Sequence, residues 1–284
     1  MIDHDTWSDR QSVTTVSVDG HDLEVAYHED GVDGGEGTPV VFVHGVPTWS
    51  FLWRDIVADV ATDRWTIAPD MLGYGNSAMS DDFDRSIRAQ ELMLEALLDD
   101  LGVDRVALVG HDIGGGVALR VAAHNPDVVE QLVLSNAVCY DSWPVEFVSN
   151  LGLPSTADIE RKELESRLDS AFVEGAYGEA DPEFVDGMKA PWLTDEGHVS
   201  LVRNAVATNT NHTTEIDYGA ITAETLLLWG KDDVMQPYAY AERLADDIDD
   251  TELAPLSESY HWVPEDRSDA YADRLREFLT DGRL

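Results

Sequence analysis

Apolar and polar residues alternate along two stretches near the start of the chain, residues 11–18 and 21–29. The Asp19-Gly20 pair between them suits a two-residue turn, so the two stretches predict a β-hairpin. Further along, short runs rich in Val, Ile and Leu predict buried strands bounded by turn residues. These strands are expected at residues 39–43, 65–69, 106–110, 131–135, 225–230 and 251–254.

Between the strands, apolar residues recur at the spacing of a helix face. The helices are expected at residues 51–60, 85–101, 117–122, 238–245 and 264–279. A loop rich in Gly and Asp is expected at residues 30–38. Strands that alternate with helices indicate an α/β protein, with a mostly parallel sheet flanked by helices on both faces.

The strand pattern is interrupted between residues 141 and 220. This segment has mixed helix and loop character, is rich in aromatic residues and has no alternating rhythm. We interpret it as a helical cap inserted into one core domain, which is formed by residues 1–140 and 221–284.

Acidic residues outnumber basic ones by 57 to 18, which gives a formal net charge of -39. They are spread between apolar segments, which argues against a disordered acidic tail. Such a surface repels itself at low ionic strength, whereas molar salt shortens the Debye length to about 3 Å. We therefore expect a cytoplasmic protein from a salt-accumulating halophile. Nucleic acids and anionic membranes are unsuitable partners for this surface, and a homo-oligomer remains open.

One stretch, residues 106–116, suggests the chemistry. An apolar run breaks at Gly110, His111 and Asp112 follow, and three glycines come next at positions 114–116. Small residues on both sides of a central polar residue are typical of a nucleophile elbow, a tight and strained strand-to-helix turn. The residue at its tip is an aspartate, Asp112.

A carboxylate with a pKa of about 4 is ionised at neutral pH and needs no base to activate it. It can attack an sp3 carbon that bears a leaving group and form an alkyl ester, which water then hydrolyses with the help of a histidine base. Attack on an ordinary ester would instead give a high-energy anhydride, so Asp112 argues against an esterase, lipase or peptidase. The alternative is that Asp112 only caps the following helix.

The run His44–Arg54, taken with Gly110-His111-Asp112, resembles the haloalkane dehalogenases of the α/β-hydrolase superfamily and, less closely, the epoxide hydrolases. The resemblance covers nearly the whole chain, and nucleophile, acid and histidine follow in that family's order. It implies an α/β-hydrolase fold, a small apolar substrate and water as the second substrate. Zinc-type spacing and a phosphate-loop lysine are both missing, so no metal and no cofactor are expected.

The resemblance also implies the remaining catalytic residues. The base is expected to be His261, in the turn before the last helix. The acid that orients it is expected to be Asp233, which follows a predicted strand, and Asp141 is the alternative. His44 and His111 are interpreted as structural neighbours of the site.

The backbone N–H groups of Ile113 and Val46 are expected to form the oxyanion hole. Haloalkane dehalogenases usually place halide-binding Trp and Asn side chains at these two positions, and the side chains present here have no donor. Trp143, Tyr177 and Trp192 in the cap are therefore the candidates for lining the substrate pocket and replacing that clamp.

These features predict a hydrolase that cleaves carbon–halogen bonds through a covalent Asp112 ester. An epoxide hydrolase with the same nucleophile is the first alternative, in which Tyr177 or Tyr140 would protonate the opening oxygen. A hydrolase homologue that binds a ligand without turnover is the second alternative.

Overall fold

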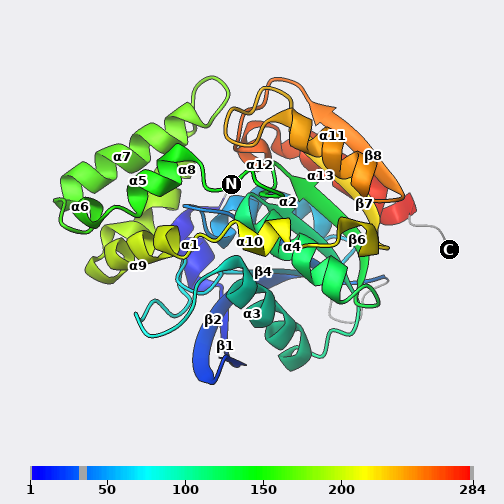
Figure 1. Ribbon diagram of the computed structural model, residues 1–284, viewed down its shortest axis with the longest axis horizontal. Coiled ribbons are helices and arrows are strands. Elements are labelled where there is room, and N and C mark those ends of the chain that lie inside the picture. The colour runs from blue at the N-terminus through cyan, green and yellow to red at the C-terminus, as the bar shows by residue number, and fades with distance from the viewer. Residues whose placement is uncertain (1, 32–36, 282–284) are drawn as a thin grey trace.

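The computed structural model describes residues 2–31 and 37–281, and its centre is one twisted sheet of eight strands (Figure 1). The strands are β1 (Ser12–Val18), β2 (His21–Asp30), β3 (Val40–Val43), β4 (Thr66–Pro69), β5 (Val106–His111), β6 (Val129–Ser135), β7 (Glu224–Gly230) and β8 (Thr251–Leu256). They are ordered β1-β2-β4-β3-β5-β6-β7-β8 across the sheet. The β1–β2 hairpin and the β2–β4 pair are antiparallel, and all other pairs are parallel, which confirms the predicted sheet.

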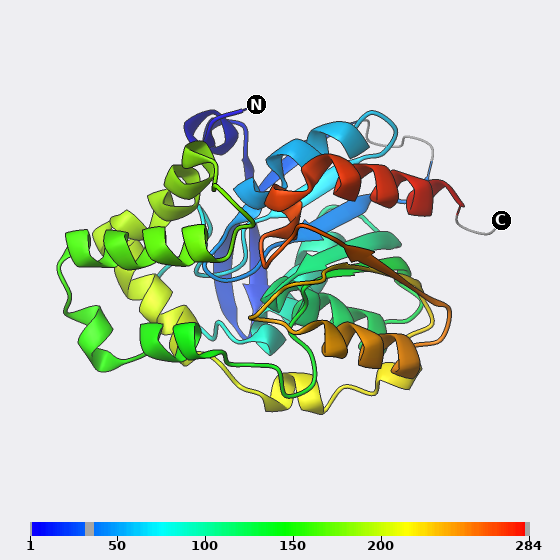
Figure 2. The same cartoon turned by 90° about the horizontal axis from the view of Figure 1, so that it is seen from above.

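Helices cover both faces of this sheet. The core helices are α1 (His4–Asp9), α2 (Arg54–Val60), α3 (Ile87–Asp100), α4 (Ile113–His124), α11 (Tyr238–Asp247), α12 (Val263–Asp266) and α13 (Ser268–Asp281). Figure 2 shows α2 and α13 side by side on one face, and α3 packs against α4 on the other. The inner strands β3 and β5 are buried along their whole length, as expected for strands covered on both sides.

Three local features differ from the sequence-based expectation. Helix α1 was not predicted; it is held because Trp7 is buried and its indole N–H donates to the Ser50 hydroxyl at 2.9 Å. The helix expected at 51–60 begins as the 3-10 turn η1 (Ser50–Trp53). The helix expected at 264–279 is divided into α12 and α13 at Arg267. Residues 32–36 of the loop expected at 30–38 lie outside the described residues.

The regular elements between residues 141 and 220 are all helical. They are α5 (Glu146–Leu151), α6 (Pro154–Ala157), α7 (Arg161–Glu174), α8 (Pro182–Lys189), η2 (Ala190–Leu193), α9 (Asp195–Val206), α10 (Asn211–Thr214) and η3 (Tyr218–Ala220). Helices α5 to α9 form a group to one side of the sheet (Figure 1). We use the word cap for residues 141–220.

The cap is joined to the core by hydrogen bonds from buried side chains. The indole N–H of Trp49 donates to the carbonyl of Gly187 on α8 at 2.9 Å. On α9, Ser200 and Asn204 both donate to the carbonyl of Gly73 in the loop after β4, at 2.8 and 2.7 Å. Among the residues that the structure describes, no helix is long and apolar enough to cross a membrane.

Candidate active site

Asp112 lies at the turn between β5 and α4. Its backbone adopts φ 52°, a left-handed conformation that costs a non-glycine residue roughly 1–3 kcal/mol. The flanking glycines make this turn sterically accessible: a Cβ on Gly110 would lie 2.6 Å from the Gly114 carbonyl oxygen, and one on Gly114 would lie 2.2 Å from the His44 carbonyl oxygen. The Asp112 side chain makes no capping hydrogen bond to α4, so the helix-cap alternative does not describe it.

The Asp112 carboxylate is buried, with the whole residue 3% exposed, and its two oxygens have different surroundings. Oδ1 accepts a hydrogen bond from the backbone N–H of Val46 at 2.8 Å. Ile113 is the first residue of α4, where backbone N–H groups have no partner within the helix. The geometry therefore places one backbone donor on the carboxylate, the N–H of Val46.

His261 lies on the opposite side of this carboxylate. Its Nε2 is 3.6 Å from Asp112 Oδ2, and its Nδ1 is 2.9 Å from Asp233 Oδ2. The ring is 2% exposed, and the backbone N–H of His261 donates to the carbonyl of Gly175 after α7. The structure thus connects Asp112, His261 and Asp233 in one chain of contacts.

Asp233, and not Asp141, lies beside Nδ1 of His261. Asp233 Oδ2 also accepts from the side-chain amide of Asn136 at 2.6 Å, and its Oδ1 accepts from the backbone N–H of Met235 at 2.7 Å. Asp141 is exposed and accepts a 3.3 Å hydrogen bond from the Tyr240 hydroxyl. The alternative acid of the sequence analysis is therefore at the surface.

The three histidines near the elbow differ in charge. Burial opposes protonation of His261, but the carboxylates of Asp233 and Asp112 outweigh it and raise its pKa to about 10. Burial lowers the pKa of His44 and of His111 to about 3, so both rings are neutral. His44 Nε2 accepts from the backbone N–H of Met71 at 3.0 Å, which fixes the loop that carries Val46.

The aromatic residues expected to line the pocket have three different environments. Trp192 is fully buried, and its indole N–H donates to the carbonyl of Pro47 at 2.6 Å, next to Val46. Trp143 is 5% exposed, and its indole N–H has no hydrogen-bond partner among the described residues. Tyr177 is 43% exposed and packs edge-on against Tyr260, so it is a surface residue and does not line a buried pocket.

Tyr74 is a residue that sequence reasoning missed. Its ring is 1% exposed and packs edge-on against His44 at 5.2 Å and against Trp192 at 5.6 Å. Burial and the charge of Asp112 both raise its pKa, so its hydroxyl stays protonated. No hydrogen bond joins this hydroxyl to any described residue.

The described residues contain no group of three or more His, Cys, Asp or Glu side chains arranged to hold a metal ion. An elbow residue between a strand and a helix, facing a histidine that has an acid behind it, is an arrangement typical of the α/β-hydrolase fold. The chain belongs to the alpha/beta hydrolase family, whose sequence profile matches residues 40–274.

Relatives with known names are similar over most of their length. Haloalkane dehalogenase 2 of Mycobacterium tuberculosis is 29% identical over 258 residues, which cover 87% of this chain and 89% of the relative. A cis-3-alkyl-4-alkyloxetan-2-one decarboxylase of Shewanella oneidensis is 25% identical and covers 88% of this chain and 84% of the relative. The family therefore includes similar proteins with different named activities.

Two solved structures show the same fold. An alpha/beta hydrolase fold protein from Burkholderia ambifaria has a TM-score of 0.83 and 25% identity, with 93% of this chain and 97% of the other covered. A haloalkane dehalogenase from Bradyrhizobium elkani has a TM-score of 0.80 and 23% identity, with 95% and 98% covered.

Proposed function

We propose that the protein is a hydrolase that cleaves carbon–halogen bonds of small apolar substrates through an ester on Asp112. The observation that carries this proposal is the asymmetry of the Asp112 carboxylate. Oδ1 is held by the Val46 N–H at 2.8 Å, and Oδ2 is 3.6 Å from Nε2 of His261. The named relative from Mycobacterium tuberculosis supports the same chemistry.

In the first step Oδ2 attacks the carbon that bears the halogen. The new C–O bond takes an electron pair from Asp112, the carbon–halogen bond breaks, and the halide leaves with the pair of that bond. The carboxylate is already charged and held in place, so the step needs no proton transfer.

In the second step water attacks Cγ of the ester. The negative charge develops on Oδ1, where the Val46 N–H is already in place, and we assign the N–H of Ile113, at the start of α4, as the second donor. His261 takes a proton from the water as the water oxygen bonds to Cγ. The Cγ–Oδ2 bond then breaks, and the alcohol leaves with the original Oδ2 and the proton that His261 returns. The new carboxyl group of Asp112 gives its proton to His261, which restores the starting carboxylate.

The charge of Asp112 links the two steps. In the free enzyme it helps to keep the pKa of His261 at about 10, so the imidazole is protonated at neutral pH. Formation of the ester removes that charge and with it part of the cause of the raised pKa. Once Asp112 has been alkylated, the imidazole of His261 can lose its proton to solvent. Only then can His261 act as a base.

The test is a single turnover in water labelled with oxygen-18. The enzyme is kept in excess over a bromoalkane, so that each site turns over once. We expect one bromide to be released for each alcohol formed. The alcohol should be unlabelled, and the peptide that carries Asp112 should contain the oxygen-18. Labelled alcohol would show that water attacks the carbon directly and would contradict the ester. An epoxide panel run in parallel tests the first alternative, in which a diol forms and no halide appears.

The tyrosines considered for that alternative are engaged elsewhere. The Tyr140 hydroxyl donates to Asp247 at 2.7 Å, and Tyr177 is at the surface. These two tyrosines therefore do not support the epoxide alternative, whereas a carbon–halogen substrate needs a hydrogen-bond donor for its leaving group but no proton.

Trp143 is the cap residue that we propose as this donor. Its buried indole N–H lacks a partner, whereas the N–H of Trp192 is bound to Pro47. Trp143→Phe removes the indole N–H and keeps an aromatic side chain. It breaks no hydrogen bond, because the Trp143 side chain makes none with the residues that the structure describes. We expect halide displacement to slow by about tenfold, the effect of one neutral hydrogen bond, in a rapid-mixing assay of bromide release.

Trp53→Phe is the matched control. The Trp53 indole N–H is also buried without a partner, but its ring packs against Phe42 in the core. Equal losses in the two variants would mean that Trp143 has no special role in halide release.

A further inference from the structure

The chain leaves the core for the cap at residues 139–145 and returns at residues 209–218, and these two connections are bonded to each other. Thr210 donates to the carbonyl of Trp143 at 2.8 Å, and Thr213 donates to the carbonyl of Tyr140 at 2.6 Å. The backbone N–H of Tyr140 donates to the Tyr218 hydroxyl at 2.8 Å. We call the pair the double connection; its two segments form one hydrogen-bonded unit.

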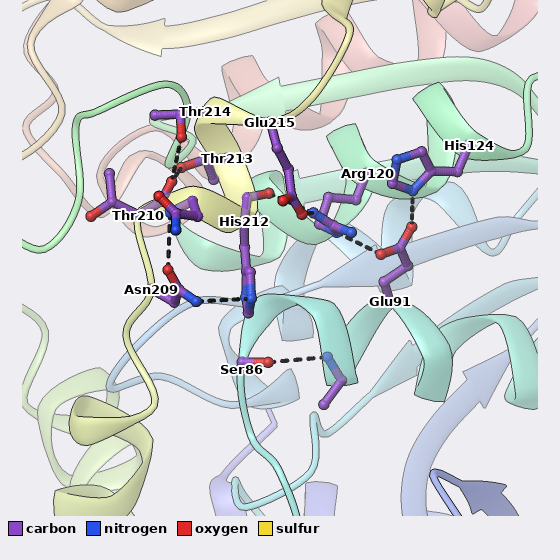
Figure 3. Close-up of polar contacts among 12 residues, drawn as sticks. Ser86, Glu91, Arg120, His124, Asn209, Thr210, His212, Thr213, Thr214 and Glu215 are labelled. Atoms are coloured by element: carbon purple, nitrogen blue, oxygen red, sulfur yellow. Dashed lines mark hydrogen bonds and ion pairs between the residues drawn. The ribbon is translucent and has the colours of Figure 1, made fainter.

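Arg120 on α4 attaches this unit to the core, and Figure 3 shows its guanidinium between Glu91 and Glu215. Its Nη1 donates to the carbonyl of His212 at 2.8 Å and to Glu215 at 2.6 Å. Its Nε donates to Glu91 on α3, whose other oxygen contacts Nδ1 of His124. One side chain thus joins two core helices to the returning segment.

The two acidic partners of Arg120, Glu91 and Glu215, differ in burial, and this difference decides which of the two contacts can break easily. The side chains of Arg120 and Glu91 are each 5% exposed, so they form a buried ion pair that neither can leave without a large penalty. The Glu215 side chain is 50% exposed. Its charge can therefore be removed while Arg120 keeps a buried partner.

The helix that carries Arg120 also carries the elbow. Asp112 immediately precedes α4, and eight residues of helix correspond to about 12 Å along its axis. Both Asp112 and His261 are almost completely buried, at 3% and 2% exposure. The two side chains are therefore almost closed to solvent in this structure.

We propose that the Arg120–Glu215 contact is a latch that holds the double connection closed against α4 and sets how often the cap loosens. Opening breaks the contact with the half-exposed Glu215 and the hydrogen bond from Arg120 to the His212 carbonyl. It leaves the buried Arg120–Glu91 pair intact, so the latch can reclose. Together with the proposed function, the latch would set the rate at which substrate enters and product leaves.

The test is amide hydrogen exchange of the full chain, compared between the wild-type protein and Glu215→Ala at one salt concentration. We expect exchange of residues 139–145 and 209–218 to accelerate by about fivefold, the upper range for a partly exposed ion pair. Exchange in β5 and β6 should be unchanged. Because exchange does not depend on turnover, this test can fail or succeed independently of the proposed reaction.

Glu163→Ala is the matched control. Glu163 forms an ion pair of the same 2.6 Å length with Arg167 on α7, and its side chain is 54% exposed, but it touches neither connection. Three results would overturn the latch: no change in Glu215→Ala, the same change in Glu163→Ala, or faster exchange spread over the core strands, which would indicate general destabilisation.

Discussion

His261→Gln is expected to reduce turnover by about a thousandfold and to leave Asp112 as a stable alkyl ester. In the proposed reaction, the first step uses only the charge of Asp112, whereas the second needs a base to take the proton of the water. Among the described residues, His261 is the one histidine with a ring nitrogen within 4.0 Å of an oxygen of this carboxylate. Glutamine fills the space without supplying a base, so the intermediate accumulates. Mass spectrometry of the peptide that contains Asp112 measures it.

The added mass also identifies the substrate. A bromoalkane adds its alkyl group, and an epoxide adds the intact ring-opened molecule. The double variant Asp112→Asn, His261→Gln is the control and should carry no adduct. An unmodified peptide from His261→Gln, despite bound substrate, would exclude Asp112 as the nucleophile.

Asp233→Asn is expected to lower turnover by about a thousandfold or more, whereas Asp141→Asn is expected to have almost no effect. The Asp233 carboxylate accepts the Nδ1–H of His261 and so keeps Nε2 facing Asp112. An asparagine there loses the charge and can turn its NH₂ toward the ring, which favours the wrong tautomer. The slower step should be hydrolysis of the ester, seen as a burst of halide followed by slow turnover.

The Asp141 variant is the matched control because it makes the same chemical change in an exposed aspartate that also follows a core strand. A comparable loss in the two variants would mean that the effect comes from net charge and not from orientation of His261. Retention of full activity in Asp233→Asn would remove Asp233 from the proposed site.

The sheet could be predicted because its signal is local. Runs such as residues 40–43 and 106–109 are apolar and β-branched, and turn residues end them, so the strands and their alternation with helices follow from the sequence. Helix α1 has only six residues, and its stability comes from Trp7 packing against distant parts of the chain. No periodic pattern of that length distinguishes such a helix from a loop.

The site residues divide in the same way. Asp112 has a local signature, because its neighbours must be small. Asp233 and Asp141 each follow a strand, and the sequence favours Asp233 without excluding Asp141. The three-dimensional positions of the Asn136 amide and of His261 decide between them. The indole N–H of Trp143 has no partner among the described residues because no acceptor from elsewhere in that part of the sequence lies next to it in space. The periodicity of the sequence carries no information on such contacts.

The left-handed backbone at residue 112 depends on the glycines around it and not on the aspartate. A hydroxyl-bearing residue at this position would have the same loop amide on one side and the same imidazole on the other. It would, however, need that imidazole as a base before its first bond forms, whereas the carboxylate needs it only afterwards. On an unchanged turn, the side chain at this one position therefore decides whether alkyl transfer or acyl transfer is the chemistry available to the scaffold.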